Sequence, residues 1–380
     1  MQMKYDFDKI LERRGTSSLK WDKYAGTDII PMWIADMDFQ SPPAVMDQLT
    51  ERIAHGVFGY TMVSQQLQDV IIKRMSDKYG WQIESDWIIW LPDLVSALHL
   101  SCRAAGDDGD EIVTFSPVYP PFFIASMQTQ KLVSIPLLRQ NGRYTFDLDA
   151  LKNAITPKTR LLLLCNPHNP VGRVYDRDEL EAITEICLEN NIKICSDEIH
   201  SDLILDDKKH IPTATLSAEA AANTITLFSA AKTFNLPGMS CSLAIIPDDE
   251  LRKRFISKRT GMVPWVNALG YVASLAAFRD SAHWHKELIE YLRSNRDMIE
   301  EFIAETPQLS MDHIEATYLA WLDVSKLNLD DPPAFFEKAG VGMSNGKDFG
   351  RGDHMRLNFG CPKATLAEAL KRIKTAIEQL

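Results

Sequence analysis

Three polar side chains follow apolar stretches of this sequence, at Asn169, Asp197 and Lys232. The separations are 28 and 35 residues (197 − 169 and 232 − 197), about one strand and one helix each. Lys232 follows the β-branched and apolar run at 224–228, which predicts a buried strand. A lysine amine that is desolvated at a strand end can lose its proton and attack a carbonyl to form a Schiff base. A surface lysine that begins a helix is the alternative for this stretch alone.

The elements around these residues alternate between strand and helix. The unbroken apolar run at 161–165 is typical of a strand buried on both faces of a parallel sheet, and 192–196 predicts the next strand. Between them, Asp176 and Glu179 form a capping-box pattern that starts a helix. This rhythm predicts a doubly wound, mostly parallel α/β domain. Ligands bind at the carboxyl ends of such strands, where the three polar side chains lie.

Further elements are predicted on both sides of this region. A helix starts near Ser41, and another follows Pro92 and runs to about Ala105. The other predicted strands are at 87–91, 111–115, 242–246, 317–322 and 355–359, and the other helices at 67–79, 280–305 and 366–380. Regular alternation ends near residue 278. We therefore predict a large α/β domain over residues 45–278 and a smaller α+β domain made of residues 1–44 and 279–380.

The composition is that of an ordinary globular protein. The 380 residues are 45% hydrophobic and 24% charged, and 41 basic against 52 acidic side chains give a net charge of −11. This balance disfavours nucleic acid and anionic membranes as partners. No apolar run reaches the roughly 18 residues of a membrane span, and the polar residues 1–9 do not resemble a signal peptide. The six scattered cysteines form no C-x-x-C pair, so we expect a cytoplasmic protein with reduced thiols.

The three strand-end residues match what pyridoxal 5′-phosphate (PLP) chemistry requires. A lysine binds the aldehyde of this cofactor covalently. An aspartate pairs with the protonated ring nitrogen, so that the ring can accept electrons, and a donor binds the phenolic oxygen. Each residue alone is weak evidence for a PLP site. Together with the segment 166–172, the three residues are strong evidence for one. The sequence therefore predicts PLP as the cofactor, and it predicts no metal site.

The sequence resembles the fold-type I pyridoxal-phosphate enzymes, the aspartate aminotransferase superfamily, over nearly its whole length. Within that superfamily it looks like the C–S β-lyases of the MalY/PatB type, which include cystathionine β-lyases. The resemblance is carried by the segments at 31–39, 58–60, 196–200, 232–235, 317–321 and 356–362. It implies a large PLP-binding domain, a smaller domain and a homodimer.

The resemblance also implies roles for residues around the cofactor ring. Lys232 would be the catalytic, cofactor-binding lysine, and Asp197 the partner of the ring nitrogen. Asn169 would lie beside the phenolic oxygen, and Tyr119 would stack on the ring. His200 stands where transaminase branches often carry tyrosine, so it matches the lyase branch; a buried core histidine is the alternative.

For the cofactor phosphate, the resemblance implies a site at the N-terminus of the helix that contains Val95 and Ser96, with Ser229 as a further donor. Tyr60 would reach the phosphate of the neighbouring subunit's cofactor. Relatives usually have glycine where this sequence has Asp93. Because a carboxylate beside a phosphate is repulsive, we expect Asp93 to point to solvent.

For the substrate, the resemblance implies that Arg356 binds the α-carboxylate, a bidentate task suited to guanidinium. Trp33 and Tyr318 are either walls of the substrate pocket or core residues. Many relatives carry a phosphate-binding arginine two residues after the glycine at position 238, where this sequence has Ser240. The lyase branch commonly lacks that arginine.

The expected function is β-elimination from L-cystathionine, L-cystine or a related cysteine S-conjugate, giving pyruvate, ammonia and a thiol. Lys232 would remove the Cα proton and then protonate the departing sulfur. An aminotransferase on the same scaffold is the second hypothesis. A regulatory or binding protein that holds the cofactor but acts through protein contacts is the third.

Overall fold

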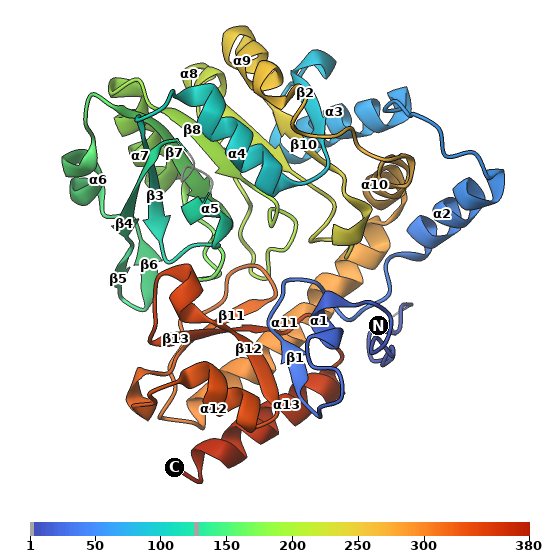
Figure 1. Ribbon diagram of the computed structural model, residues 1–380, viewed down its shortest axis with the longest axis vertical. Helices are drawn as coiled ribbons and strands as arrows, with labels where there is room; N and C mark the ends of the chain where they lie inside the picture. Colours follow the sequence, from blue (N-terminus) through green and yellow to red (C-terminus); the bar gives the residue numbers. More distant parts are fainter. Residues whose placement is uncertain (1–3, 125–128) are drawn as a thin grey trace.

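The computed structural model describes residues 4–124 and 129–380. Within these residues the largest sheet has seven strands, in the order β2 (Ile88–Leu91), β10 (Ser242–Ile245), β9 (Thr224–Phe228), β8 (Lys193–Asp197), β7 (Thr159–Cys165), β3 (Glu111–Ser116) and β4 (Lys131–Pro136). Strand β10 runs antiparallel to both neighbours, and the pairs from β9 to β4 are parallel. Figure 1 shows this sheet with helices packed around it. The predicted doubly wound, mostly parallel α/β fold is confirmed.

Both faces of the large sheet are covered. Along β7, Leu161 and Leu163 lie in one core with α4 (Leu94–Ala105), whereas Leu162 lies in a second core with α7 (Arg177–Glu189). Successive side chains of a strand point to opposite faces, so a run of four leucines is explained by burial on both sides. The predicted strands and helices agree with the observed ones to within three residues at each end.

A smaller sheet contains strands from both ends of the chain. Its order is β1 (Ile30–Met32), β12 (Val341–Asn345), β13 (His354–Asn358) and β11 (Leu319–Asp323). Strand β1 pairs with β12 in parallel, and β13 runs antiparallel to β12 and β11. The N-terminal segment thus shares a sheet with the C-terminal part of the chain, as Figure 1 shows below the large sheet. The predicted domain limits at residues 44/45 and 278/279 stay a prediction.

The remaining elements surround these two sheets or connect them. A short two-stranded sheet pairs β5 (Leu138–Gln140) with β6 (Arg143–Thr145). The other α-helices are α1 (Leu19–Asp22), α2 (Pro43–His55), α3 (Gln65–Tyr79), α5 (Pro121–Ile124), α6 (Leu148–Ala154), α8 (Ala218–Asn223), α9 (Asp249–Arg259), α10 (Ala268–Asp280), α11 (Ala282–Ala304), α12 (Pro332–Lys338) and α13 (Lys363–Ile377). In the described part of the chain, no helix is long and apolar enough to cross a membrane. All six cysteines are buried, and none forms a disulfide.

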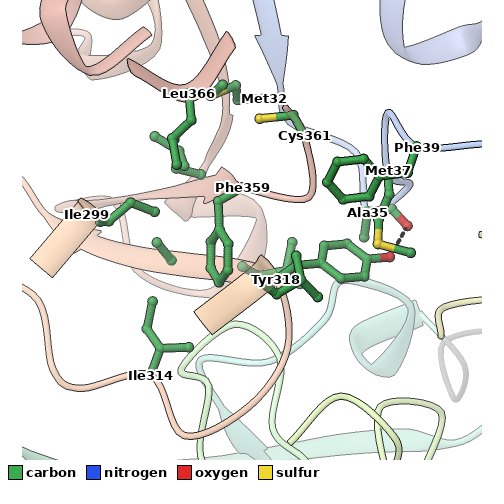
Figure 2. Packing of buried hydrophobic residues seen from close by; sticks show 14 of the residues in the cluster. Met32, Ala35, Met37, Phe39, Ile299, Ile314, Tyr318, Phe359, Cys361 and Leu366 are labelled. Carbon is green, nitrogen blue, oxygen red and sulfur yellow. Dashed lines mark hydrogen bonds between the residues drawn. The ribbon is translucent and has the colours of Figure 1, made fainter. Parts of the chain in front are cut away.

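The smaller sheet packs on α11 and α13, and the N-terminal segment closes this core (Figure 2). Ala35, Met37 and Phe39 lie in the same apolar cluster as Phe359. The Tyr318 hydroxyl, which is almost completely buried, donates a hydrogen bond to the Ala35 carbonyl at 3.0 Å. A buried phenol needs such a partner. The loop before α2 is therefore fixed against the core by both apolar packing and a hydrogen bond.

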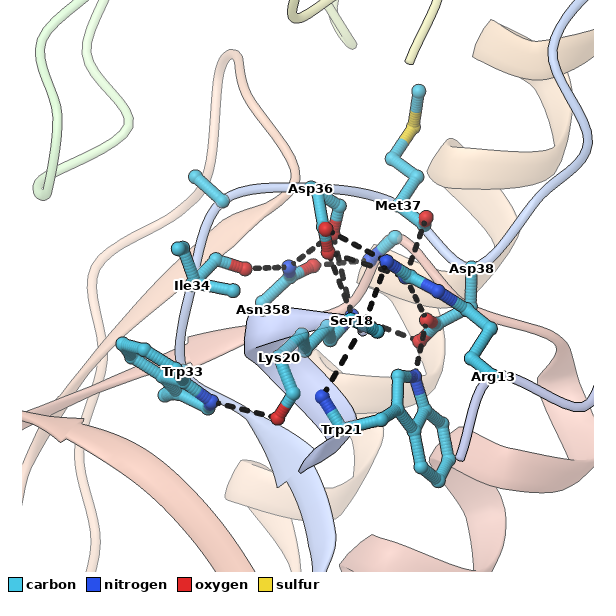
Figure 3. Close-up of polar contacts among 12 residues, drawn as sticks. Arg13, Ser18, Lys20, Trp21, Trp33, Ile34, Asp36, Met37, Asp38 and Asn358 are labelled. Carbon is cyan, nitrogen blue, oxygen red and sulfur yellow. Dashed lines mark hydrogen bonds and ion pairs between the residues drawn. The ribbon is translucent and has the colours of Figure 1, made fainter. Parts of the chain in front are cut away.

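A network of charges fixes the same loop from its other side (Figure 3). The buried Asp38 carboxylate accepts hydrogen bonds from Arg13 at 2.6 Å, Lys20 at 2.8 Å and the Trp21 indole at 2.8 Å. Arg13 also pairs with Asp36 at 2.8 Å. Lys20 is 1% exposed, so its ammonium depends on Asp38 for compensation. Lys20 and Arg13 hold the pKa of the Asp38 carboxyl below its usual value, against the opposing effect of its burial.

Replacing Asp38 with asparagine is expected to destabilise the fold. The Lys20 ammonium would keep its hydrogen bond to the Asp36 carbonyl at 3.2 Å, and the nearest opposite charge would be the more distant Asp36 carboxylate, 3.7 Å away. Breaking a buried ion pair on one side typically costs about 3 kcal/mol or more. We expect Asp38→Asn to lower the free energy of unfolding by about that amount in urea titrations.

The matched control is Asp77→Asn. Asp77 pairs with Lys73 at 2.8 Å, and both side chains are well exposed. An exposed i,i+4 pair contributes about 0.5 kcal/mol or less. Equal losses of stability in the two variants would contradict the role assigned to the Asp38 network.

Candidate active site

The carboxyl ends of β7, β8 and β9 lie in register. Asp197 pairs with Cys165 on one side and with Leu227 on the other. The end of β8 and the loops that follow β7 and β9 bring Asp197, Asn169 and Lys232 to one pocket, as predicted from their spacing. The pocket is lined by Ala35, Pro92, Asp93, Leu94, Val95, Leu98, Tyr119, Cys165, Asn169, Asp197, Ile199, His200, Ala231, Lys232, Pro237, Ser240, Cys241 and Ser242.

Asp197 is the last residue of β8 and is 5% exposed. Its Oδ1 accepts a hydrogen bond from the backbone N–H of Ile199 at 3.1 Å. Burial raises the pKa of Asp197 to about 6, although the Ile199 N–H and the nearby Lys232 oppose that shift. A buried carboxylate with this surrounding is suited to accept a cationic N–H donor from a ligand.

Lys232 lies four residues beyond the end of β9. Its Nζ donates to the Ala35 carbonyl at 2.7 Å, the same oxygen that accepts from Tyr318. Burial of the amine, followed by repulsion from Arg356, lowers the pKa of Lys232 to about 8. A larger fraction of this amine is therefore neutral near pH 7 than for an exposed lysine, and the neutral amine is the nucleophilic form.

Arg356 enters the site from β13 of the smaller sheet and is 4% exposed. Nη1 donates to Asn169 Oδ1 at 3.0 Å, and Nη2 donates to the Trp33 carbonyl at 2.7 Å and to Ser344 Oγ at 3.2 Å. Its Nε has no partner among the described residues. The guanidinium carbon is 4.6 Å from the centre of the Phe349 ring. This buried cation is held by neutral groups, so it can receive an anion.

Two further aromatic side chains line the pocket. His200 is buried, and desolvation, followed by the nearby Lys232 and Arg356 cations, lowers the pKa of its imidazole to about 3. His200 is therefore neutral at physiological pH. Tyr119 is half-buried, and burial raises the pKa of its phenol. Both side chains line the pocket, as predicted.

The first turn of α4 forms one end of the pocket. Val95 lines it, whereas Ser96 is turned to Asp93. The Ser96 backbone N–H donates to Asp93 Oδ1 at 2.7 Å, and Ser96 Oγ donates to Asp93 Oδ2 at 2.9 Å. Asp93 is exposed, as expected, but its carboxylate is also hydrogen-bonded to the first turn of α4, and Asp93 is one of the residues that line the pocket.

A family model for aminotransferases of class I and II matches residues 27–373. The chain belongs to this family. Among solved structures, OvoB is 44% identical with a TM-score of 0.96, covering 98% of this chain and 99% of its own. Cystalysin from Treponema denticola, whose structure contains pyridoxal 5′-phosphate, is 32% identical with a TM-score of 0.95. The match covers 99% of this chain and 100% of the cystalysin chain. The cystathionine β-lyase PatB of Bacillus subtilis is 39% identical over 98% of this chain and all of its own.

Six of the predicted site residues are not among those that line the pocket. Arg356 and Ser96, described above, contact pocket-lining residues, Asn169 and Asp93 respectively. The other four are engaged elsewhere. The Ser229 hydroxyl donates to the Cys241 carbonyl at 2.8 Å and accepts from a backbone N–H, so it is engaged with the main chain. The Trp33 indole donates to the Lys20 carbonyl at 3.0 Å (Figure 3), and its contact with the site is the carbonyl bound to Arg356. Tyr318 belongs to the core but touches the site through Ala35. Tyr60 is fully exposed on a separate surface.

Several residues of the site were not predicted as site residues. Ser240 and Ser242 line the pocket. Ser240 was noted only because relatives carry arginine there. Ser344 reaches Arg356 because the two residues are partners in the pairing of β12 with β13. Phe349 packs on the same guanidinium. No motif marks Ser344 or Phe349. The strand register was needed to find Ser344, and the three-dimensional structure to find Phe349.

Proposed function

We propose that this chain is a PLP-dependent C–S β-lyase that cleaves L-cystathionine, L-cystine or a related cysteine S-conjugate into pyruvate, ammonia and a thiol. The observation that carries the proposal is full-length similarity to the cystathionine β-lyase PatB, in a chain whose pocket holds Lys232 and Asp197, with Arg356 bound to the pocket residue Asn169. Cystathionine β-lyases use this chemistry on amino acids, so we propose an amino acid as the substrate.

The donor set fits PLP. The Asp197 carboxylate lies at the end of β8 with only a backbone N–H donating to it among its hydrogen bonds in the described chain, which leaves a place for a protonated ring nitrogen. Lys232 is an amine of lowered pKa within the same pocket, suited to bind the aldehyde. Asn169 accepts from Arg356 through Oδ1, so its Nδ2 is the donor end for the phenolic oxygen. Tyr119 supplies an aromatic face.

When bound, PLP supplies an electron sink for the negative charge that develops at Cα of the substrate. Arg356 would hold the α-carboxylate, since its Nε is unpartnered in the described chain and its cation has no carboxylate among its hydrogen-bond partners. The Lys232 amine would take the proton from Cα and then donate a proton to the departing sulfur. His200, neutral because of its low pKa, adds no charge that would compete with Arg356.

We also propose that residues 45–278 form the PLP-binding domain and that residues 1–44 and 279–380 form the smaller domain, which supplies Arg356. The phosphate would lie at the first turn of α4, beside the backbone of Val95 and Ser96. Ser229 would then act by holding the Cys241 carbonyl rather than as a direct donor. We propose a cytoplasmic location, since all six cysteines are buried and unpaired.

A homodimer completes the proposal. Tyr60, Met62 and Trp265 are 110%, 88% and 78% exposed, and with Phe58 they line a single groove of about 990 Å³. Exposed apolar surface of this extent is typical of a protein interface. We propose that a second copy covers it and that Tyr60 reaches the cofactor phosphate of that copy.

The test of the function is the release of pyruvate and free thiol from L-cystathionine by the PLP-loaded protein, without any added 2-oxo acid. We expect the two products in equal amounts. Lys232→Ala should lower turnover by about 10³-fold or more, because both proton transfers are lost. Lys73→Ala, at an exposed lysine on α3, is the control and should retain wild-type turnover.

Absence of pyruvate, with amino transfer appearing once 2-oxoglutarate is supplied, would replace the lyase with an aminotransferase. Sustained elimination by the Lys232→Ala variant would contradict the role of that lysine. Lack of both activities in a protein that binds PLP would refute the proposal for these substrates.

If the protein is a homodimer, its molecular mass in sedimentation experiments should be about twice the 43.0 kDa of one chain. Trp265→Asp places a charge in the proposed interface and should shift the protein to monomer. Leu138→Asp, at an exposed leucine on β5 outside the groove, should leave the dimer intact. A wild-type monomer at micromolar concentration would contradict the interface.

A further inference from the structure

The phosphate end of the pocket already contains an anion. Asp93 is the N-cap of α4, and its carboxylate accepts from the Ser96 backbone N–H and from the Ser96 hydroxyl. These two groups are among the donors that a helix N-terminus offers to a phosphate. The twelve-residue helix presents its positive end to the carboxylate of its own chain.

The surroundings do not neutralise this carboxylate. Among the pocket-lining residues of the described chain, Lys232 is the only lysine or arginine, and its amine is hydrogen-bonded to Ala35. Ser240 and Ser242 also line the pocket and provide hydroxyl groups but no positive charge. A phosphate dianion that enters this end therefore meets one carboxylate and no cationic side chain other than Lys232.

We infer that Asp93 is an intramolecular competitor of the cofactor phosphate. In the cofactor-free protein its carboxylate occupies the Ser96 donors, and PLP must displace it or bind beside it. The competition weakens every ligand that binds through an anion alone, such as inorganic phosphate. PLP meets the same competition at its phosphate, although its bond to Lys232 through the aldehyde makes its total affinity higher. The inference rests on the proposed function and names a residue that sets the affinity of the site for the phosphate.

The test compares two aldehydes on cofactor-free protein, pyridoxal 5′-phosphate and pyridoxal, which lacks the phosphate. Their dissociation constants are measured by equilibrium dialysis for the wild type, Asp93→Asn and Asp93→Gly. Asparagine keeps the capping ability without the charge, and glycine is tolerated at this position of a helix. Removing a like charge from the anion site should tighten PLP about tenfold and leave pyridoxal within about twofold.

Asp248→Asn is the matched control. Asp248 caps α9 in the same way, accepting from the Leu251 N–H at 2.7 Å, but it does not line the pocket. This variant should bind both aldehydes as the wild type does. As an independent readout, inorganic phosphate should raise the melting temperature of Asp93→Asn more than that of the wild type.

Unchanged or weaker PLP binding in both Asp93 variants would overturn the inference and leave the proposed function standing. Equal tightening of PLP and pyridoxal would also overturn it, because the effect would then not involve the phosphate. Failure of the wild type and all variants to bind either aldehyde would refute the proposed function, and the inference with it.

Discussion

The structure depends on the burial of three ionisable side chains around one pocket. Asp197, Lys232 and Arg356 are hydrogen-bonded to backbone groups, an amide and a hydroxyl rather than to opposite charges. Desolvation therefore moves each toward its neutral form: the pKa of Asp197 rises to about 6, that of Lys232 falls to about 8 and that of Arg356 falls to about 10. Such costs are retained where a ligand supplies the missing charges.

Two sheets and one loop hold these groups together. Asp197 and Lys232 come from neighbouring parallel strands of the large sheet, and Arg356 comes from β13 of the smaller sheet. The loop 33–38 bridges them, since the Trp33 carbonyl binds Arg356 and the Ala35 carbonyl binds Lys232. The charge network around Asp38 and the apolar core under Ala35 fix that loop. The N-terminal segment thus contributes to the site without a catalytic side chain.

Much of this could be predicted from the sequence because it rests on local patterns. The leucine run of β7 indicated a buried parallel strand, and the capping box at Asp176 indicated the start of a helix. The spacing of the successive strands predicted that Asn169, Asp197 and Lys232 lie at one edge of the sheet. Strand β12 was missed, because its Gly342 and polar end lack a strand period, and with it the contact of Ser344 to Arg356. The hydrogen bond from the Ser96 N–H to the Asp93 carboxylate depends on the geometry of the helix cap. The repulsion expected between a carboxylate and a phosphate did not predict it.

The most direct test of the buried-charge account is competitive labelling of lysines with trace acetic anhydride in the cofactor-free protein, followed by peptide mapping. The account predicts that labelling of Lys232 rises with pH through a midpoint near 8, because its amine loses the proton there. Lys73, an exposed lysine on α3, serves as the internal reference in the same sample. Identical midpoints for the two lysines would contradict a desolvated amine at position 232 and, with it, the central claim.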